Sequence, residues 1–251
     1  MKISIITVSL NSANTIEECI ISAVNQSYKN IEHIIIDGGS TDRTLDIIKK
    51  YESKISFWIS EKDYGIFDAM NKGIRIATGE VVGLLNSDDI FYDENIISKV
   101  AEAFTSDIYC VYGNLIYVSR SNINKITRKW QSNEFKDGLF EKSWVPAHPT
   151  FYCRKKIYDR YGGYRLDFKI ASDGELMYRF LQKNRVKSKF INHYFVRMRN
   201  GGNSNKGIKS TIIITKEMKR AIKENGGNFN LLKYLFFKLL KIRQFLFKNI
   251  E

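Results

Sequence analysis

The stretch VVGLLNSDD, from Val81 to Asp89, joins a continuous apolar run to two adjacent carboxylates. Such a run is typical of a strand that is buried on both faces of a parallel sheet. Two neighbouring carboxylates repel each other, so the turn that carries them needs a compensating partner. One explanation is a helix start, because Ser and Asp are favoured there and acidic side chains stabilise the first turn. The other is a bound cation.

The eighty residues before this stretch repeat a strand–helix pattern. Apolar runs predict strands at 3–8, 31–36 and 55–59, and stripes at helical spacing predict helices at 15–24, 42–51 and 66–77. The first of these helices begins with a capping box that runs from Thr15 to Glu18. This alternation predicts an α/β fold with a mostly parallel central sheet and helices on both faces.

Acidic residues follow three of the predicted strands, at Asp37, at Glu61 and Asp63, and at Asp88 and Asp89. The carboxyl ends of parallel strands share one edge, where ligands bind. Asp37 is also a candidate cap for the next helix. Three acidic clusters at one edge of a basic protein predict a bound cation, and oxygen ligands favour Mg²⁺ or Mn²⁺. Because these ions bridge carboxylates to phosphates, the edge is predicted to bind a nucleoside diphosphate.

Composition and the absence of certain motifs exclude several other classes of protein. The 251 residues, 43% of them hydrophobic, predict one compact unit, and no apolar run reaches the roughly 20 residues of a membrane span. Three cysteines and three histidines lack zinc-ligand spacing, and the cysteines are expected to be reduced, in a cytosolic protein. Neither a glycine-rich dinucleotide motif nor a Walker loop occurs. The net charge of +13 favours a polyanionic partner such as nucleic acid, anionic lipid or a phosphorylated substrate.

Four segments in register carry a family resemblance: SIITVSLNSANT, IIIDGGSTDRT, EKDYGIFDAMNKGIRIATGE and GLLNSDD. Together they resemble family 2 glycosyltransferases of the GT-A fold, above all the bacterial branch that builds capsule, O-antigen and exopolysaccharide. The resemblance covers residues 3–89, with a weaker continuation from HPTFYCRKK onward. It implies a Rossmann-like α/β/α sandwich. It also implies inverting, metal-dependent transfer of a hexose or N-acetylhexosamine from a UDP-sugar to a saccharide acceptor.

The resemblance also assigns residues to the donor site and to the metal. Donor-binding positions are Thr7, Ser9, Asn11, Asp37, Asp63, Lys72, Asn86 and Asp88. Asp88 and Asp89 match the metal motif, with Asp89 as the direct ligand of Mn²⁺ or Mg²⁺, and His193 is a candidate late metal ligand. Asn86 stands where many relatives carry the first acid of this motif, so the site holds one charge fewer. Lys72 is either a phosphate contact or a solvated surface lysine.

A second group of residues is implied for the chemistry. Asp173, in ASDGEL, matches the family's catalytic base, with Glu175 as the substitute. The alternative for Asp173 is the N-cap of a helix that starts near Glu175. His148 falls in the acceptor-binding region, but the residues themselves favour a buried structural histidine. Arg197 or Arg199 is a candidate contact to the diphosphate.

The chain is predicted to divide into a catalytic domain, residues 1–205, and a basic amphipathic helical tail, residues 206–251. Within the domain, residues 1–110 form the nucleotide-sugar-binding half and residues 111–205 the acceptor and catalytic half. No acidic residue occurs between Asn228 and Ile250, while leucines and phenylalanines gather on one helical face. Such a helix is typical of an anchor on an anionic membrane surface. The alternative is a terminal helix that packs on the core.

Taken with the resemblance, the tail predicts a cytoplasmic enzyme held at the inner face of the cytoplasmic membrane, with a lipid-linked saccharide as acceptor and no nucleic acid as partner. A homodimer is a further possibility. Two other classes stay open: a nucleic-acid-binding protein, suggested by the charge, and a sugar nucleotidyltransferase. The first lacks a recognition motif, and the second usually shows a glycine-rich N-terminal loop that VSLNSANT does not provide.

Overall fold

The computed structural model describes residues 1–201 and 207–240. Its strands are β1 (Ile3–Ser9), β2 (Ile31–Asp37), β3 (Phe57–Ser60), β4 (Val81–Leu84), β5 (Asp89–Phe91), β6 (Cys110–Val118), β7 (Ile126–Trp130), β8 (Tyr152–Arg154) and β9 (Ser188–Arg199). Its α-helices are α1 (Ile16–Val24), α2 (Thr44–Lys50), α3 (Ile66–Ile76), α4 (Ile96–Ala103), α5 (Lys155–Tyr161), α6 (Ser172–Met177), α7 (Ile208–Glu224) and α8 (Leu231–Leu240). A short 3₁₀ turn, η3, covers His148–Thr150.

Within the described residues the strands form one mixed sheet in the order β3-β2-β1-β4-β8-β6-β9-β5, with β7 paired to β6. The pairs β3–β2, β2–β1 and β1–β4 are parallel, as the strand–helix alternation predicts. The short strand β8 then runs antiparallel to both β4 and β6. It joins the two halves of the sheet. The second half contains a further parallel pair, β6–β9, beside the antiparallel pairs β6–β7 and β5–β9, and the α/β prediction is confirmed.

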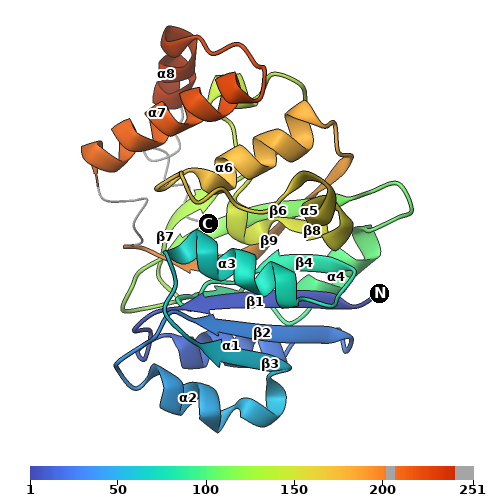
Figure 1. Cartoon of the computed structure of the whole chain (residues 1–251), viewed down its shortest axis with the longest axis vertical. Helices are drawn as coiled ribbons and strands as arrows, with labels where there is room; N and C mark the ends of the chain where they lie inside the picture. Colours follow the sequence, from blue (N-terminus) through green and yellow to red (C-terminus); the bar gives the residue numbers. More distant parts are fainter. Residues whose placement is uncertain (202–206, 241–251) are drawn as a thin grey trace.

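Helices cover both faces of this sheet (Figure 1). Alternate residues of β1 point to opposite faces, as the period of a strand requires. Ile3 and Ile5 pack with side chains of α1 and α4, whereas Ile6 and Val8 pack with α3 and α6. Burial on both sides explains why β1 reads as a continuous apolar run rather than as an alternating one.

One local expectation fails at the start of α1. Thr15 is the N-cap residue, but its side chain makes no capping hydrogen bond. Glu18, the other end of the predicted capping box, instead forms an ion pair with Arg199 of β9. A long-range partner therefore replaces the local one, and α1 is connected to the far half of the sheet.

The C-terminal helices α7 and α8 lie beyond α6, at the top of the molecule in Figure 1. α7 packs on the catalytic half through the buried side chains of Met218, Ala221 and Ile222. α8 buries only Tyr234. Among the described residues, none of the helices combines the length and apolarity that a membrane span requires. The last predicted part of the tail, residues 241–251, lies outside the described residues.

Candidate active site

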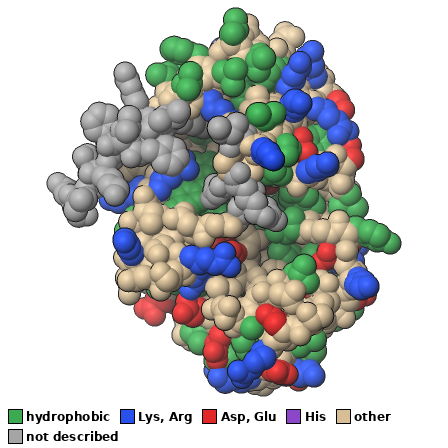
Figure 2. Space-filling view, turned by 90° about the vertical axis from the view of Figure 1, so that its left-hand side faces the viewer, with side chains coloured by type: hydrophobic (Ala, Val, Ile, Leu, Met, Phe, Trp, Pro, Cys, Tyr) green, Lys and Arg blue, Asp and Glu red, His purple; other side chains and the backbone are tan. Residues whose placement is uncertain are grey.

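Loops from four strands meet at the carboxyl edge of the parallel half. The Ser87 N–H donates to the Val8 carbonyl at 3.3 Å, and the hydroxyls of Ser87 and Ser12 lie 2.8 Å apart. The loop after β2 joins them, because the Thr41 N–H donates to the Asn11 side-chain oxygen at 2.9 Å. Figure 2 looks onto this edge and shows a hollow with an apolar floor between the lower and upper parts of the molecule.

Asp37 ends β2 and is fully buried, yet both of its carboxylate oxygens are supplied with donors. Oδ1 accepts hydrogen bonds from the hydroxyls of Ser9 (2.8 Å) and Ser40 (2.5 Å). Oδ2 accepts from the Ser60 hydroxyl (2.7 Å) and from the N–H groups of Gly39 (3.1 Å) and Ser40 (2.8 Å). Burial disfavours the charged form, but these bonds outweigh it and lower the pKa of Asp37. The carboxylate therefore holds the loops after β1, β2 and β3 together.

Asp63 lies directly over this loop. Its Oδ2 occupies the space that a side chain at Gly38 would take, and its Oδ1 accepts the Gly65 N–H at 2.8 Å. Lys72 forms ion pairs with Glu61 at 2.9 Å and with Asp68 at 3.6 Å, which together raise its pKa. Lys72 is thus a largely buried, paired lysine, with 17% of its side chain exposed, and not a lysine free in solvent.

Asp88 and Asp89 follow β4, as the sequence predicts, in a turn that leaves acceptor atoms without donors. Asp89 is fully buried, and its Oδ1 has no hydrogen-bond partner among the described residues. Its Oδ2 accepts the Asn86 amide at 3.2 Å, while Asn86 Oδ1 is also buried without a partner there. Burial, and then the charge of Asp88, raise the pKa of Asp89 well above its ordinary value.

These atoms fit a divalent cation. Unpaired oxygens beside two carboxylates are the donor set that Mg²⁺ and Mn²⁺ prefer. Among the described residues, no cluster of three or more His, Cys, Asp or Glu side chains surrounds a potential metal position. Among the described residues the turn offers two carboxylates, Asp88 and Asp89, beside the Asn86 side-chain oxygen, which suits an ion whose other ligands are diphosphate oxygens and water. Arg199 supports the turn by donating to the Asp88 carbonyl at 2.8 Å.

Asp173 lies in the first turn of α6, which begins at Ser172, so it is not the N-cap residue that one reading of the sequence suggested. Instead, the carboxylate of Glu217 accepts the N–H groups just before the helix, those of Lys169, Ile170 and Ala171, at 2.7–3.0 Å. Glu217 belongs to α7, and no local pattern in the sequence indicates this role.

Glu175, the substitute base, is not available for proton transfer. It is buried and forms an ion pair with Arg179 at 2.9 Å. Arg179 also donates to the carbonyls of Gly162 and Gly163, at 2.9 Å and 2.8 Å. This ion pair ties α6 to the Gly-Gly segment that precedes it, which leaves Asp173 as the candidate base.

The structure brings Asp173 to His148, the predicted acceptor residue, whose Nδ1 lies 3.3 Å from Asp173 Oδ2. Burial lowers the pKa of His148, against the opposing charges of Asp173 and Asp88. Burial also raises the pKa of Tyr117, and the charges of Asp89 and Asp173 add to this shift. The charges of the metal motif and of the candidate base therefore both act on Tyr117 and His148, which come from the second half of the chain.

Two predicted residues are not brought to this space. Thr7 is buried, and its hydroxyl contacts His33 Nε2 at 3.0 Å on the inner side of β1. His193 pairs with Asp93 at 2.8 Å. β9 places Met198 opposite Asp89, so His193 lies farther along the strand by roughly 16 Å. The structure thus gives no support to His193 as a ligand of the Asp88–Asp89 site.

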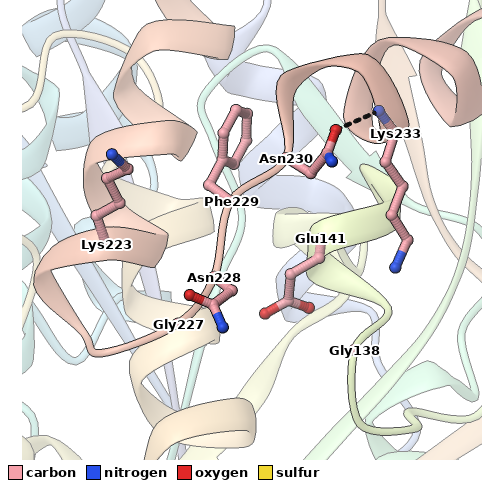
Figure 3. Close-up of a pocket in the computed structure, with 8 residues that line it drawn as sticks. All are labelled: Gly138, Glu141, Lys223, Gly227, Asn228, Phe229, Asn230 and Lys233. Carbon is pink, nitrogen blue, oxygen red and sulfur yellow. Dashed lines mark hydrogen bonds between the residues drawn. The ribbon is translucent and has the colours of Figure 1, made fainter.

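A separate pocket of about 570 Å³ lies between the end of α7, the start of α8 and the segment from Gly138 to Glu141. Figure 3 shows the side chains of Glu141 and Asn228 facing each other across it. Its wall contains none of the residues that the sequence analysis assigned to the donor, the metal or the base.

Comparison with known proteins gives a consistent picture. The family model described as Glycosyl transferase family 2 matches residues 4–162. An uncharacterized glycosyltransferase of Mycobacterium tuberculosis H37Rv is 32% identical over 186 residues, which cover 70% of this chain and 68% of that protein. A PGL/p-HBAD biosynthesis glycosyltransferase of Mycobacterium bovis BCG is 27% identical over 224 residues, covering 86% and 82%.

Solved structures show the same fold at low identity. Residues 1–349 of S. aureus TarS, in complex with UDP-GlcNAc, match with a TM-score of 0.71 at 17% identity, over 100% of this chain and 76% of that 1–349 chain. A mannosyltransferase from Pyrobaculum calidifontis, in complex with GDP-Man and Mn²⁺, matches with a TM-score of 0.65 at 16% identity, over 98% and 72%. The chain therefore belongs to glycosyl transferase family 2 and is a glycosyltransferase with the GT-A fold.

Proposed function

We propose that the protein is an inverting, metal-dependent glycosyltransferase that moves a hexose or N-acetylhexosamine from a UDP-sugar to a saccharide acceptor. One observation carries this proposal. A buried carboxylate whose Oδ1 has no partner among the described residues, Asp89, and a second, separately held carboxylate, Asp173, both lie near Tyr117. Single displacement needs these two functions on opposite sides of the anomeric carbon. Neither a nucleic-acid-binding protein nor a nucleotidyltransferase accounts for family membership.

In this mechanism Asp173 accepts the proton of the acceptor hydroxyl as its oxygen attacks the anomeric carbon. The new C–O bond forms while the bond to the diphosphate breaks, and its electron pair leaves with the diphosphate. Asp88 and Asp89 would hold Mn²⁺ or Mg²⁺, which when bound offsets the charge of the departing diphosphate. Ser9, Asn11 and the Asp37 loop would hold the nucleoside.

The donor class follows from the site and from the structural relatives. Asp63, held over Gly38 beside the Asp37 loop, would accept a hydrogen bond from the base or the ribose. Lys72, which pairs with Glu61 and Asp68, would exchange a carboxylate partner for a phosphate. TarS binds UDP-GlcNAc and the mannosyltransferase binds GDP-Man with Mn²⁺. We propose a UDP-sugar by analogy with TarS, and the titration with GDP tests the alternative.

The test of this function is a thermal-shift titration with UDP and, separately, GDP, each with and without Mn²⁺. We expect a metal-dependent rise in melting temperature with UDP, and a matching release of UDP from a UDP-sugar during turnover. Asp173→Asn should reduce transfer by about 10²- to 10⁴-fold, while leaving the UDP shift near that of the wild type. Full activity of this variant would exclude Asp173 as the base, and the absence of any nucleotide-dependent shift would refute the donor site.

The C-terminal helix suggests where the enzyme works. Six side chains on one side of α8 are exposed, the most open being Leu232 at 80% and Leu239 at 62%; the others are Leu231, Leu235, Phe236 and Leu240. Figure 2 shows apolar side chains gathered at the top of the molecule, where Figure 1 draws this helix. The absence of acidic residues from Asn228 to Ile250 makes a second copy a poor partner for this face and an anionic lipid surface a good one.

We therefore propose a peripheral enzyme at the inner face of the cytoplasmic membrane, acting on a lipid-linked acceptor in cell-surface polysaccharide synthesis. Cosedimentation with phosphatidylglycerol vesicles should be strong, and it should be weak with phosphatidylcholine. The variant Leu232→Asp/Leu239→Asp should lose most of this binding. Leu166→Asp is the control, because Leu166 is 54% exposed and belongs to the segment between α5 and α6, not to α8. Equal binding by the α8 variant and the control would refute the anchor.

A further inference from the structure

His148 and Asp173 meet from two segments that are far apart in the chain. Their closest atoms, His148 Nδ1 and Asp173 Oδ2, are 3.3 Å apart, and 25% of each side chain is exposed. The other carboxylate oxygen, Oδ1, accepts the Gly174 N–H at 2.8 Å. Each oxygen of the candidate base thus has one nitrogen neighbour, and each retains a second lone pair.

The backbone that carries His148 is held firmly. His148 opens the η3 turn, and Pro149 fixes the backbone of the next residue. The Thr150 hydroxyl closes the turn, 2.7 Å from the Ala147 carbonyl, and accepts the Gly113 N–H of the central strand β6 at 3.3 Å. The imidazole therefore projects from a turn that is anchored in the sheet, not from a loose loop.

The backbone that carries Asp173 is held equally well, by different partners. The Glu217 carboxylate accepts three N–H groups ahead of α6, at residues 169–171. The Ser172 hydroxyl donates to the Arg165 carbonyl at 2.8 Å. Two independent anchors therefore fix the separation of the imidazole and the carboxylate. A base that must reach one hydroxyl benefits from this, because small misplacements cost large factors in rate.

We propose that His148 is a positioning residue for Asp173, donating its Nδ1–H to Oδ2 so that a free lone pair of the carboxylate points at the acceptor hydroxyl. This role rests on the proposed function, in which Asp173 is the base. The proton of the hydroxyl passes to Asp173, and the imidazole stays neutral throughout. Burial of the ring favours that neutral form at pH 7. Donation to Oδ2 requires the Nδ1–H tautomer.

Three variants of the full chain separate positioning from direct proton transfer. In His148→Asn the amide nitrogen takes the place of Nδ1, whereas in His148→Gln it takes the place of Nε2, and His148→Phe removes both donors. The assay is release of UDP from UDP-N-acetylglucosamine, UDP-glucose or UDP-galactose with Mn²⁺, which needs no acceptor because water takes its place. Donor affinity is measured separately by the UDP thermal shift.

We expect kcat to fall by about 10- to 100-fold in the Gln and Phe variants and by less than about 5-fold in the Asn variant. The UDP thermal shift should stay close to that of the wild type in all three. Equal losses in Asn and Gln would overturn the proposal, because the ring itself would then be the required group. Wild-type rates in Gln and Phe would overturn it as well.

An independent measurement does not depend on activity. The chain has only three histidines, so their ring signals are readily assigned in long-range ¹H–¹⁵N spectra. We expect the Nδ1–H tautomer for His148, and a lower pKa for this ring in Asp173→Asn, because the carboxylate charge that raises it is lost. An Nε2–H tautomer of His148, or a His148 pKa that Asp173→Asn leaves unchanged, would refute the contact between the two side chains. This test applies even if the protein shows no activity in any transfer assay. Failure of wild-type turnover alone would refute only the proposed function.

Discussion

Two carboxylates at the same edge of the sheet, Asp37 after β2 and Asp89 after β4, are equally buried and yet differ electrostatically. Asp37 accepts five hydrogen bonds, and its pKa is lowered despite burial. Asp89 accepts one side-chain hydrogen bond, from Asn86, keeps an oxygen without a partner, and has a raised pKa. Only one strand, β1, separates them.

The difference separates a structural acid from a ligand-binding one. A buried carboxylate surrounded by donors is already stabilised as an anion, and removing it leaves those donors unsatisfied. A buried carboxylate with an unpaired oxygen beside a second acid is costly until a cation arrives. Both acids lie at the end of a strand, so position alone does not distinguish a structural carboxylate from a ligand-binding one. The number of hydrogen-bond donors around each carboxylate does.

The largest expected effect is at Asp89. Asp89→Asn keeps the shape and the bond with Asn86 but removes the charge, so transfer should fall by about 10²- to 10³-fold and the Mn²⁺-dependent UDP shift should disappear. Without metal, the urea midpoint of this variant should equal or exceed that of the wild type, because a costly buried charge is gone. A variant that unfolds more readily without metal would show that Asp89 has a structural role like that of Asp37.

The second prediction concerns Asp37. Asp37→Ala leaves three hydroxyls and two N–H groups without their acceptor, so the free energy of unfolding should fall by about 3 kcal/mol. Urea denaturation followed by tryptophan fluorescence measures this loss. Asp63→Ala is the matched control, since Asp63 accepts a single N–H, from Gly65, and should cost less than about 1 kcal/mol. Equal losses of unfolding free energy in Asp37→Ala and Asp63→Ala would show that the five hydrogen bonds to Asp37 do not make it more important for stability than Asp63.

The N-terminal half of this architecture was predictable from the sequence because its signals are local. Continuous apolar runs identify strands buried on both faces, and the strand–helix alternation fixes their parallel order, so residues 31–36 and 81–85 were located within a residue or two. The same reasoning placed Asp88 and Asp89 at the strand edge. The second half has short strands such as β8, whose antiparallel pairing depends on distant partners and leaves no periodic signal.

The site shows the same limit. Sequence spacing indicates that Asp173 opens a helix, but not that His148 contacts it from a turn 25 residues earlier. Sequence spacing also does not indicate that Glu175 forms an ion pair with Arg179, or that Glu217 of α7 accepts hydrogen bonds from the segment before α6. Thr7 lies on a strand whose period sends it inward, to His33. Each of these outcomes depends on which long-range neighbour is present, which no local motif specifies.

A third acid extends the comparison to the opposite end of β2. Glu32 accepts hydrogen bonds from Lys2 (2.7 Å), from the Ser4 hydroxyl (2.5 Å), and from the Thr78 hydroxyl and N–H (2.6 Å and 2.8 Å). Burial raises its pKa, but these donors outweigh burial and lower it to about 2. Glu32 therefore belongs with Asp37, far from the carboxyl edge and from any ligand.

The smallest expected effect is the pH dependence that Glu32 confers. Because its pKa is lower in the folded chain than the value of about 4.3 expected when unfolded, its contribution is complete above about pH 4.5 and is lost as pH falls toward about 2. The contribution should be on the order of 1 to 2 kcal/mol, since the Lys2 partner is 40% exposed and screened by solvent. Urea midpoints of wild type and Glu32→Gln should therefore differ most at pH 6, differ by about half as much near pH 3, and converge near pH 2. If the urea midpoints of the two proteins instead differed by the same amount at every pH in this range, the donors around Glu32 would stabilise the neutral amide as well as the anion. The number of hydrogen-bond donors around a buried acid would then not be enough to identify it as a structural residue.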